Sequence, residues 1–154
     1  MFFCVNGSST CYQQPAAGVN VASSTSLNVS NVNLSAGSWQ IYVQTGAGAS
    51  ARSAAFTVQP APPAITSYSW TSTPTGGQPF NGSIYGSNFV IGGTQVWFCV
   101  VNTATCYQHP SAGVNVINST SLNVSNVNLS SGSWQIYLQT SAGQSGRSTT
   151  FSVR

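Results

Sequence analysis

Ser133-Trp134-Gln135-Ile136-Tyr137-Leu138-Gln139-Thr140 is the stretch that decides the fold, because large apolar side chains alternate along it with polar or amphipathic ones. Successive side chains of a β-strand point to opposite faces, so the alternation places one side of the strand in a core and the other in water. Leu122 and Val124 alternate with polar residues in the same way, as do Phe151 and Val153. These patterns predict half-buried antiparallel strands.

Similar short runs continue outward from this stretch, and turn-forming Gly and Ser residues separate them. No run shows the apolar spacing of a helix. The expected strands lie near 65–70, 80–85, 94–100, 105–108, 114–118, 121–127, 133–140 and 148–153. Short strands at this spacing are typical of a β-sandwich, so we expect an all-β chain.

The chain also contains an internal repeat at an offset of 95 residues. Residues 1–59 align with residues 96–154 without a gap, and 40 of the 59 positions are identical. The run Ser24–Ser35 recurs unchanged as Ser119–Ser130. Self-similarity of this kind predicts an array of modules that share one fold.

A proline-rich segment, residues 60–64, separates the two copies. Its sequence Pro60-Ala61-Pro62-Pro63-Ala64 predicts a stiff, extended linker. Residues 65–95 follow it and have no counterpart ahead of the first copy. We therefore expect a complete repeat at 65–154 and, at 1–59, a partial repeat that lacks its first strands.

A series of short motifs runs through the complete repeat in a fixed order. They are Pro63-Ala64-Ile65-Thr66-Ser67, Phe80–Phe89 with its Gly86-Ser87-Asn88-Phe89 turn, Thr94–Phe98, Leu129–Ile136 and Thr140-Ser141-Ala142-Gly143. Together they resemble the immunoglobulin-like IPT/TIG domain over residues 64–154, and in part over 1–58. The resemblance implies tandem immunoglobulin-like β-sandwiches, the first one incomplete at its N-terminus. Such domains occur in bacterial surface proteins, beside polysaccharide enzymes, in receptors and in transcription factors, and the family has no catalytic residue.

Charged side chains are nearly absent, at 2% of the residues, and the chain contains no Asp, Glu or Lys. Glycosidases of the common kind need paired carboxylates, calcium sites need several carboxylate oxygens, and a Ser-His-Asp triad needs its Asp. The only histidine, His109, aligns with Gln14, so the repeat does not require an imidazole there. We expect no enzyme activity, no catalytic residue, no metal site and no cofactor.

Partners that need clustered charge or a long apolar segment are not expected either. The three arginines are scattered, whereas nucleic-acid binding needs clustered basic side chains to neutralise phosphates. No stretch approaches the roughly 18 to 20 apolar residues of a membrane span. We therefore expect neither nucleic-acid binding nor a membrane span.

The four cysteines form two pairs with six residues between partners, Cys4 with Cys11 and Cys99 with Cys106. Opposed residues on adjacent antiparallel strands lie about 4.5 to 5.5 Å apart, which is within reach of a disulfide. We expect two disulfides that each bridge a hairpin, and hence an extracellular or cell-surface location, because disulfides persist in oxidising compartments. The alternative is four reduced cysteines in the core.

Aromatic and arginine side chains provide the candidate surface contacts. Trp39 and Trp134 are in phase with buried isoleucines, so we assign them to the core. The arginines find no carboxylate side chain in this chain and must contact backbone carbonyls, an aromatic face, a chain terminus or another molecule. The candidate contact residues are Trp97, Trp70, Tyr42, Tyr137, Arg52 and Arg147.

Two functions fit these observations. The first is a structural repeat subunit of an extracellular fibre, stalk or adhesin that assembles with other copies of the same protein. Its incomplete repeat is either cut from a longer array or receives its missing strands from another subunit by strand complementation, which would form head-to-tail polymers. The alternative is a carbohydrate-binding or accessory module of a polysaccharide-active protein, with exposed aromatic and amide side chains as contacts.

Overall fold

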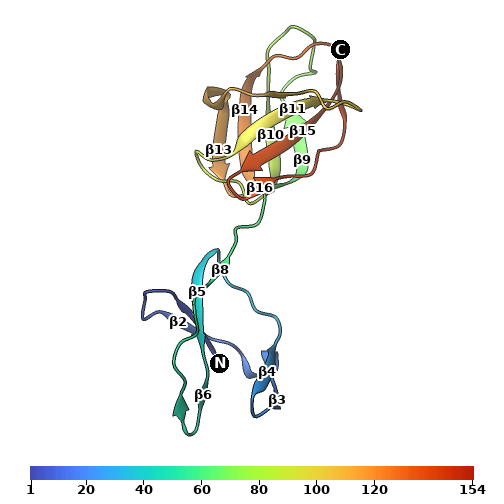
Figure 1. The fold of residues 1–154 in the computed structure, drawn as a ribbon. Coiled ribbons are helices and arrows are strands. Elements are labelled where there is room, and N and C mark those ends of the chain that lie inside the picture. The colour runs from blue at the N-terminus through green and yellow to red at the C-terminus, as the bar shows by residue number, and fades with distance from the viewer. The chain divides into compact units, whose positions relative to one another are not determined.

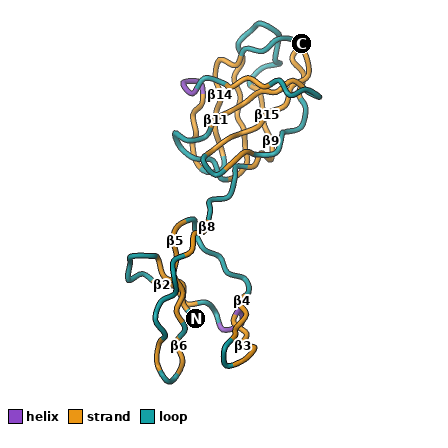
Figure 2. Tube along the Cα trace, viewed as in Figure 1, coloured by secondary structure: helices purple, strands orange, loops and turns teal.

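The computed structural model describes residues 1–154 and divides into two compact units, Met1–Pro60 and Ala61–Arg154 (Figure 1). Both units consist of strands and loops, and each contains one three-residue 3-10 helix, η1 (Ala16–Gly18) or η2 (Ser111–Gly113) (Figure 2). The prediction of an all-β chain is confirmed.

The second unit is a complete two-layer sandwich. One sheet has the order β13-β14-β10-β9, and the other has the order β12-β11-β15-β16, with β17 also paired to β15. These are the ABED and CFG sheets of the immunoglobulin fold, with β12 as an added C′ strand. The strands are β9 (Ala64–Trp70), β10 (Phe80–Ser87), β11 (Gln95–Val100), β12 (Cys106–Gln108), β13 (Val114–Asn118), β14 (Ser121–Val127), β15 (Gly132–Thr140), β16 (Gly143–Gln144) and β17 (Phe151–Val153).

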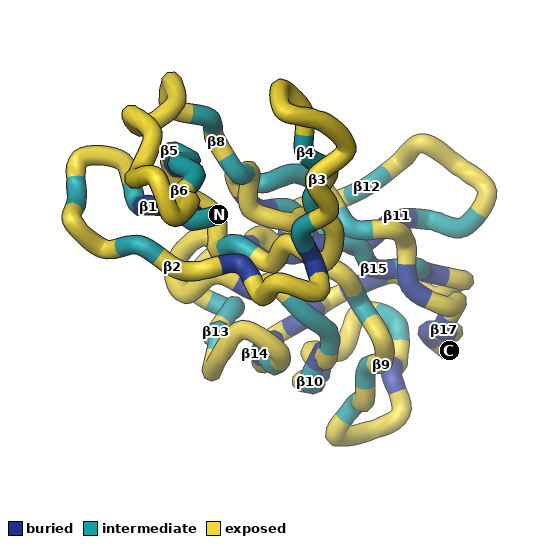
Figure 3. The backbone as a smooth tube through the Cα atoms, turned by 90° about the horizontal axis from the view of Figure 1, so that it is seen from below, coloured by how far each residue is buried: buried dark blue, intermediate teal, exposed yellow.

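Alternating apolar side chains from both sheets fill the space between the layers. Ile84 and Leu122 point inward from the first sheet, Phe98 and Ile136 from the second, and none is more than 1% exposed. Burial of one such side chain contributes about 1.5 to 3 kcal/mol. The buried stretches along β11 and β15 are visible in Figure 3.

The expected strands of this unit are present, and each begins and ends within two residues of its predicted position, except for the start of the last one. The last begins at Phe151 instead of residue 148. Ser148 Oγ accepts a hydrogen bond from the Ile136 backbone N–H at 2.9 Å, and Ser145 Oγ accepts one from Leu138 N–H at 2.8 Å. The backbone N–H groups of Ser148 and Ser145 still donate to the carbonyl oxygens of Ile136 and Leu138, so the serine side chains replace only the backbone acceptors along this edge of β15.

The first unit repeats only part of this architecture. Its main sheet has the order β2-β1-β5-β8, which corresponds to β12-β11-β15-β17, while β3–β4 and β6–β7 form separate two-stranded sheets. Counterparts of β9 and β10 are absent, so this sandwich is incomplete at its N-terminus. The strands are β1 (Phe2–Val5), β2 (Cys11–Gln13), β3 (Val19–Ser23), β4 (Ser26–Val29), β5 (Gly37–Tyr42), β6 (Gln44–Thr45), β7 (Gly48–Ala49) and β8 (Phe56–Val58).

Strand β4 shows what the missing strands do. Its counterpart β14 spans seven residues and pairs with β10 from Ser121 to Val127, whereas β4 spans four residues and ends at Val29. The two segments have identical sequences, so local propensity cannot explain the difference. Pairing with β10 extends the strand, which is a tertiary effect.

We expect the same substitution to have unequal effects in the two identical segments. Leu122 is fully buried, whereas Leu27 is partly exposed. Leu122→Ala should lower the free energy of unfolding of the second unit by about 2 to 5 kcal/mol, because it leaves a cavity in a packed core. Leu27→Ala should lower the free energy of unfolding of the first unit by much less. Chemical denaturation of the two variants and the unsubstituted chain measures both effects, and equal losses would contradict this account.

Candidate interaction surfaces

Two disulfides close the hairpins at the ends of β1 and β11. Cys4 is bonded to Cys11 and Cys99 to Cys106, each pair being in direct cross-strand register with a Cα–Cα distance of 4.0 Å. No free cysteine remains, so the predicted pairing is confirmed and the reduced alternative is wrong for this structure. Two disulfides and an immunoglobulin-like fold are consistent with an extracellular domain.

The two equivalent arginines hold the same hairpin loops from outside. Arg52 donates a hydrogen bond to the Ser8 carbonyl oxygen at 2.8 Å, and its guanidinium lies 3.6 Å from Cys11 Sγ. Arg147 donates to the Thr103 carbonyl oxygen at 3.3 Å and lies 3.7 Å from Cys106 Sγ. Both side chains therefore use backbone carbonyls, one of the partners expected for them.

An aromatic stack lies on the outer face of each CFG sheet. Trp97 and Tyr137 are register partners on β11 and β15, with ring centroids 5.6 Å apart and ring planes within 8°. Their counterparts Phe2 and Tyr42 stack at 4.7 Å and 2°. The four rings are partly buried, because each covers one face of its neighbour. Such cross-strand aromatic pairs stabilise a sheet.

The outer face of the first unit brings two of the predicted contact residues, Tyr42 and Arg52, to one depression, together with Phe2, the counterpart of Trp97. This depression has a volume of about 640 Å³ and is lined by Phe2, Ser9, Cys11, Tyr42, Gln44, Ala49, Ser50 and Arg52. In the second unit, Cys99 and Trp97 are two residues apart on β11, so their side chains point to the same outer face. Arg147 contacts the disulfide there. The candidates other than Trp70 therefore belong to this one type of surface.

Trp70 lies elsewhere, and the structure corrects its assignment. Its ring packs on the core side of β9, with centroids 4.8 Å from Phe151 and 5.0 Å from Phe80. Trp70 and Tyr68 are two residues apart and share the inward face of the strand. The sequence pattern around β9 was too irregular to reveal this phase, because a bulge opposite Tyr85 and Gly86 interrupts the strand pairing.

The predicted core positions of Trp39 and Trp134 agree with the structure. Each is 4% exposed and donates its indole N–H to a backbone carbonyl, that of Ser35 or Ser130. Tyr12 or Tyr107 covers the ring in each unit.

His109 has a structural contact in this fold. The side chain is buried, and its Nε2 lies 3.0 Å from the Ser125 carbonyl oxygen. In the first unit, Gln14 is buried at the same place, and its Nε2 donates to the Ser30 carbonyl oxygen at 2.9 Å. An imidazole and an amide thus make the same loop contact in the two units.

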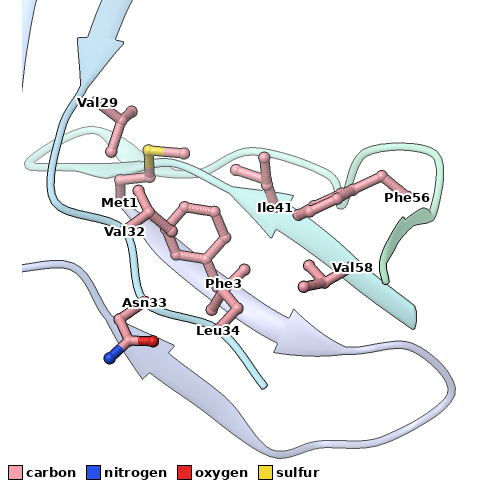
Figure 4. Close-up of a pocket in the computed structure, with 9 residues that line it drawn as sticks. All are labelled: Met1, Phe3, Val29, Val32, Asn33, Leu34, Ile41, Phe56 and Val58. Carbon is pink, nitrogen blue, oxygen red and sulfur yellow. The ribbon is translucent and has the colours of Figure 1, made fainter. Parts of the chain in front are cut away.

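A different kind of surface, which we name the open groove, lies on the inner face of the first unit. Its side chains converge from β1, β5 and β8 and from the end of β4 and the segment that follows it (Figure 4). The space they enclose is about 440 Å³ and, apart from Asn33, its lining is apolar. The lining residues are Met1, Phe3, Val29, Val32, Asn33, Leu34, Ile41, Phe56 and Val58.

The sequence indicated a partial repeat that lacks its first strands, but it did not identify the groove residues. A residue-by-residue comparison could have found them, since the position of each is 95 residues before a residue of the second unit. The counterparts of Phe3, Ile41 and Phe56 are the core residues Phe98, Ile136 and Phe151. None of the expected contact residues lines the open groove.

The structure contains no helix with the length and apolar character needed to cross a lipid bilayer. It also contains no cluster of three or more His, Cys, Asp or Glu side chains.

Comparison with family models gives no match for this chain. Comparison with curated proteins gives none either. Among solved structures, the chain is similar to the FN1-FN3 domains of chicken CNTN1, with 13% sequence identity and a TM-score of 0.33, over 99% of this chain and 54% of that one. The chain thus spans about half the length of that structure. A similarity this low does not establish the fold. The immunoglobulin-like fold follows from the strand order itself.

We expect the Cys99–Cys106 disulfide to stabilise the second unit. Its loop is short, with a sequence separation of seven residues. Loop closure of this size corresponds to about 2 to 3 kcal/mol. Replacing both cysteines by serine should lower the free energy of unfolding by that amount in urea. Thiol titration of the denatured, unreduced wild-type chain should find no free thiol; a titration that found four would contradict the disulfides.

Proposed function

We propose that this chain is a structural repeat of an extracellular fibre, stalk or adhesin, built from IPT/TIG-like immunoglobulin modules that assemble with further modules of the same kind. The observation that carries the proposal is how the polar residues are used. Cysteines, arginines and the His109–Gln14 position each hold a loop of their own unit and converge on no reactive centre. The repeat therefore preserves contacts that maintain a scaffold.

The linker and the surface chemistry support the same role. Three prolines within residues 60–64 limit the bending of the chain between the two units. The surface carries little charge, because the chain has only three charged side chains. Neighbouring modules with so little charge repel one another weakly, which favours close assembly.

Labelling of cells that make the protein tests the extracellular part of this proposal. An antibody raised against residues 61–154 should label intact cells, and protein extracted under alkylating conditions should carry no modified thiol until it is reduced. The control is the same labelling after permeabilisation. Labelling seen only after permeabilisation, or thiols that are free on extraction, would contradict the proposal.

Carbohydrate binding is the second candidate, and the outer-face depression favours it. The depression combines the Phe2–Tyr42 stack with Gln44 and Arg52, and aromatic faces beside amide groups are common contacts for sugars. The mutual stacking of the two rings leaves only one face of each free, which limits a platform of this kind.

Affinity electrophoresis against a panel of polysaccharides separates the two candidates. Under the structural proposal, the wild-type chain should migrate at the same rate with and without polysaccharide in the gel. Retardation that Tyr42→Ala and Tyr137→Ala abolish, while the loop variant Thr103→Ala retains it, would instead establish the carbohydrate role.

A further inference from the structure

The open groove of the first unit and the core of the second unit are made of the same residues. Val32 is 40% exposed, whereas its identical counterpart Val127 is fully buried. Other identical pairs show the same kind of difference, because their side chains are partly exposed in the first unit and buried in the second. These pairs are Leu27 with Leu122, Val29 with Val124, Leu34 with Leu129, Ile41 with Ile136, Phe56 with Phe151, and Val58 with Val153.

In the second unit, the strand pair β9–β10 covers this face. Phe80 and Ile84 of β10 are 3% and 0% exposed, and Trp70 of β9 packs on Phe151 and Phe98 with centroids 4.8 Å and 6.4 Å away. The counterparts of the two covered phenylalanines are also phenylalanines. The first unit therefore presents the same aromatic face that β9–β10 is shaped to cover.

Hydrogen bonds add specificity to this packing. Asn81 Oδ1 accepts the Asn126 backbone N–H at 2.9 Å, and Ser83 Oγ donates to Asn123 Oδ1 at 2.9 Å. The Gly77 backbone N–H donates to the Leu129 carbonyl oxygen at 3.0 Å. Asn126, Asn123 and Leu129 recur in the first unit as Asn31, Asn28 and Leu34.

In the first unit, the backbone at Asn31 has the conformation that Asn126 has where it bonds to β10. Asn31 has a φ of 55° and Asn126 a φ of 57°, so the same turn is kept although β10 has no counterpart there. The outer edge of β4 has no neighbouring strand in its sheet. An unpaired edge of this kind is a template for strand addition.

Copies of this chain cannot supply enough β9–β10 strand pairs to cover all of one another's faces. Each chain has two such faces, one per unit, and a single β9–β10 strand pair. Any exchange of strand pairs between copies would leave one face per chain uncovered. A strand pair that covers the open groove must therefore come from residues other than these 154.

The connection between β10 and β11 indicates how that occupant is attached. Ser87 ends β10 and Gln95 begins β11, so only residues 88–94 link the covering strands to the covered sheet. The counterpart of Val96 is Met1. A strand pair joined ahead of Met1 by a similar short link would reach the groove within one polypeptide, at a far higher effective concentration than a separate chain.

We propose that the open groove binds an antiparallel strand pair of the same chemistry as residues 64–87, joined ahead of Met1 in the same polypeptide. This inference rests on the proposed role of the chain as part of a longer series of modules. The occupant would carry an aromatic residue and an isoleucine at the positions of Phe80 and Ile84, and glycine at those of Gly82 and Gly86.

The glycines are required by close approaches within the strand pair. A Cβ atom on Gly82 would collide with the ring of Trp70 and lie 2.5 Å from the Ser69 carbonyl oxygen. A Cβ atom on Gly86 would collide with the Ala64 carbonyl oxygen. Glycine at both places allows the two strands to pair over the groove.

The experiment adds a second copy of residues 61–95 directly ahead of Met1 in the full chain. Backbone amide exchange is then followed by NMR, which distinguishes the identical segments 24–35 and 119–130. We expect exchange at residues 26–32 to slow by about 100-fold or more, towards the rates of 121–127. Binding of an apolar dye to the unextended chain should be lost on extension.

Two substitutions within the added copy serve as a matched pair. Ile84 is fully buried, whereas its neighbour Tyr85 points outward and is 43% exposed. Ile84→Asp in the added copy should abolish the protection of residues 26–32, and Tyr85→Asp should leave it in place. Equal effects of the two substitutions would overturn the proposal.

Two further arms cover the other outcomes. If the extended chain aggregates, a separate peptide of residues 61–95 at saturating concentration should protect the same amides of the unextended chain. If the amides are protected in neither arm, the proposal is overturned. It is also overturned if the unextended chain becomes protected on self-association, because a second copy would then be the occupant. Cell-surface labelling is independent of these results, so the proposed function can stand or fall separately.

Discussion

Pairing of β10 with β14 is the interaction on which the sandwich depends, because it joins the two inner strands of one sheet and places Phe80 and Ile84 over the other sheet. A sheet with one apolar face gains little stability until a second layer covers that face. The chain contains the sequence of β14 twice, once with this partner and once, at β4, without it. Paired with β10, the strand spans seven residues over a buried core. Without this partner, the strand spans four residues beside the open groove.

The CFG sheet forms in both units, which shows that it depends on other contacts. In each unit a disulfide ties the first hairpin, an arginine donates to a carbonyl of the loop, and a buried tryptophan bonds the backbone four residues earlier. These contacts are local to the sheet and its loops. A chain without carboxylate side chains has no side-chain ion pairs for this purpose, so covalent and backbone-directed bonds hold the loops instead.

Sequence patterns predicted the strands well because alternation with a period of two reflects the pleat of a half-buried strand. The cysteine spacing similarly reflected the geometry of a hairpin. Trp70 was assigned to the wrong side because a bulge disturbs the phase of β9. The start of β17 was misplaced because the side-chain oxygens of Ser145 and Ser148 take the place of backbone acceptors there. The stacking of Trp97 on Tyr137 depends on the register between strands, which no single strand encodes.

Coverage by β9–β10, and not local sequence, decides how much of the segment shared by residues 24–35 and 119–130 forms a strand. Backbone amide exchange in the unmodified chain compares residues 24–35 with the identical residues 119–130 inside one molecule. We expect the amides of Leu122 to Val127 to exchange only on unfolding of the second unit, whereas those of Leu27 to Val32 should exchange by local opening at far higher rates. Equal protection of the two segments would contradict it.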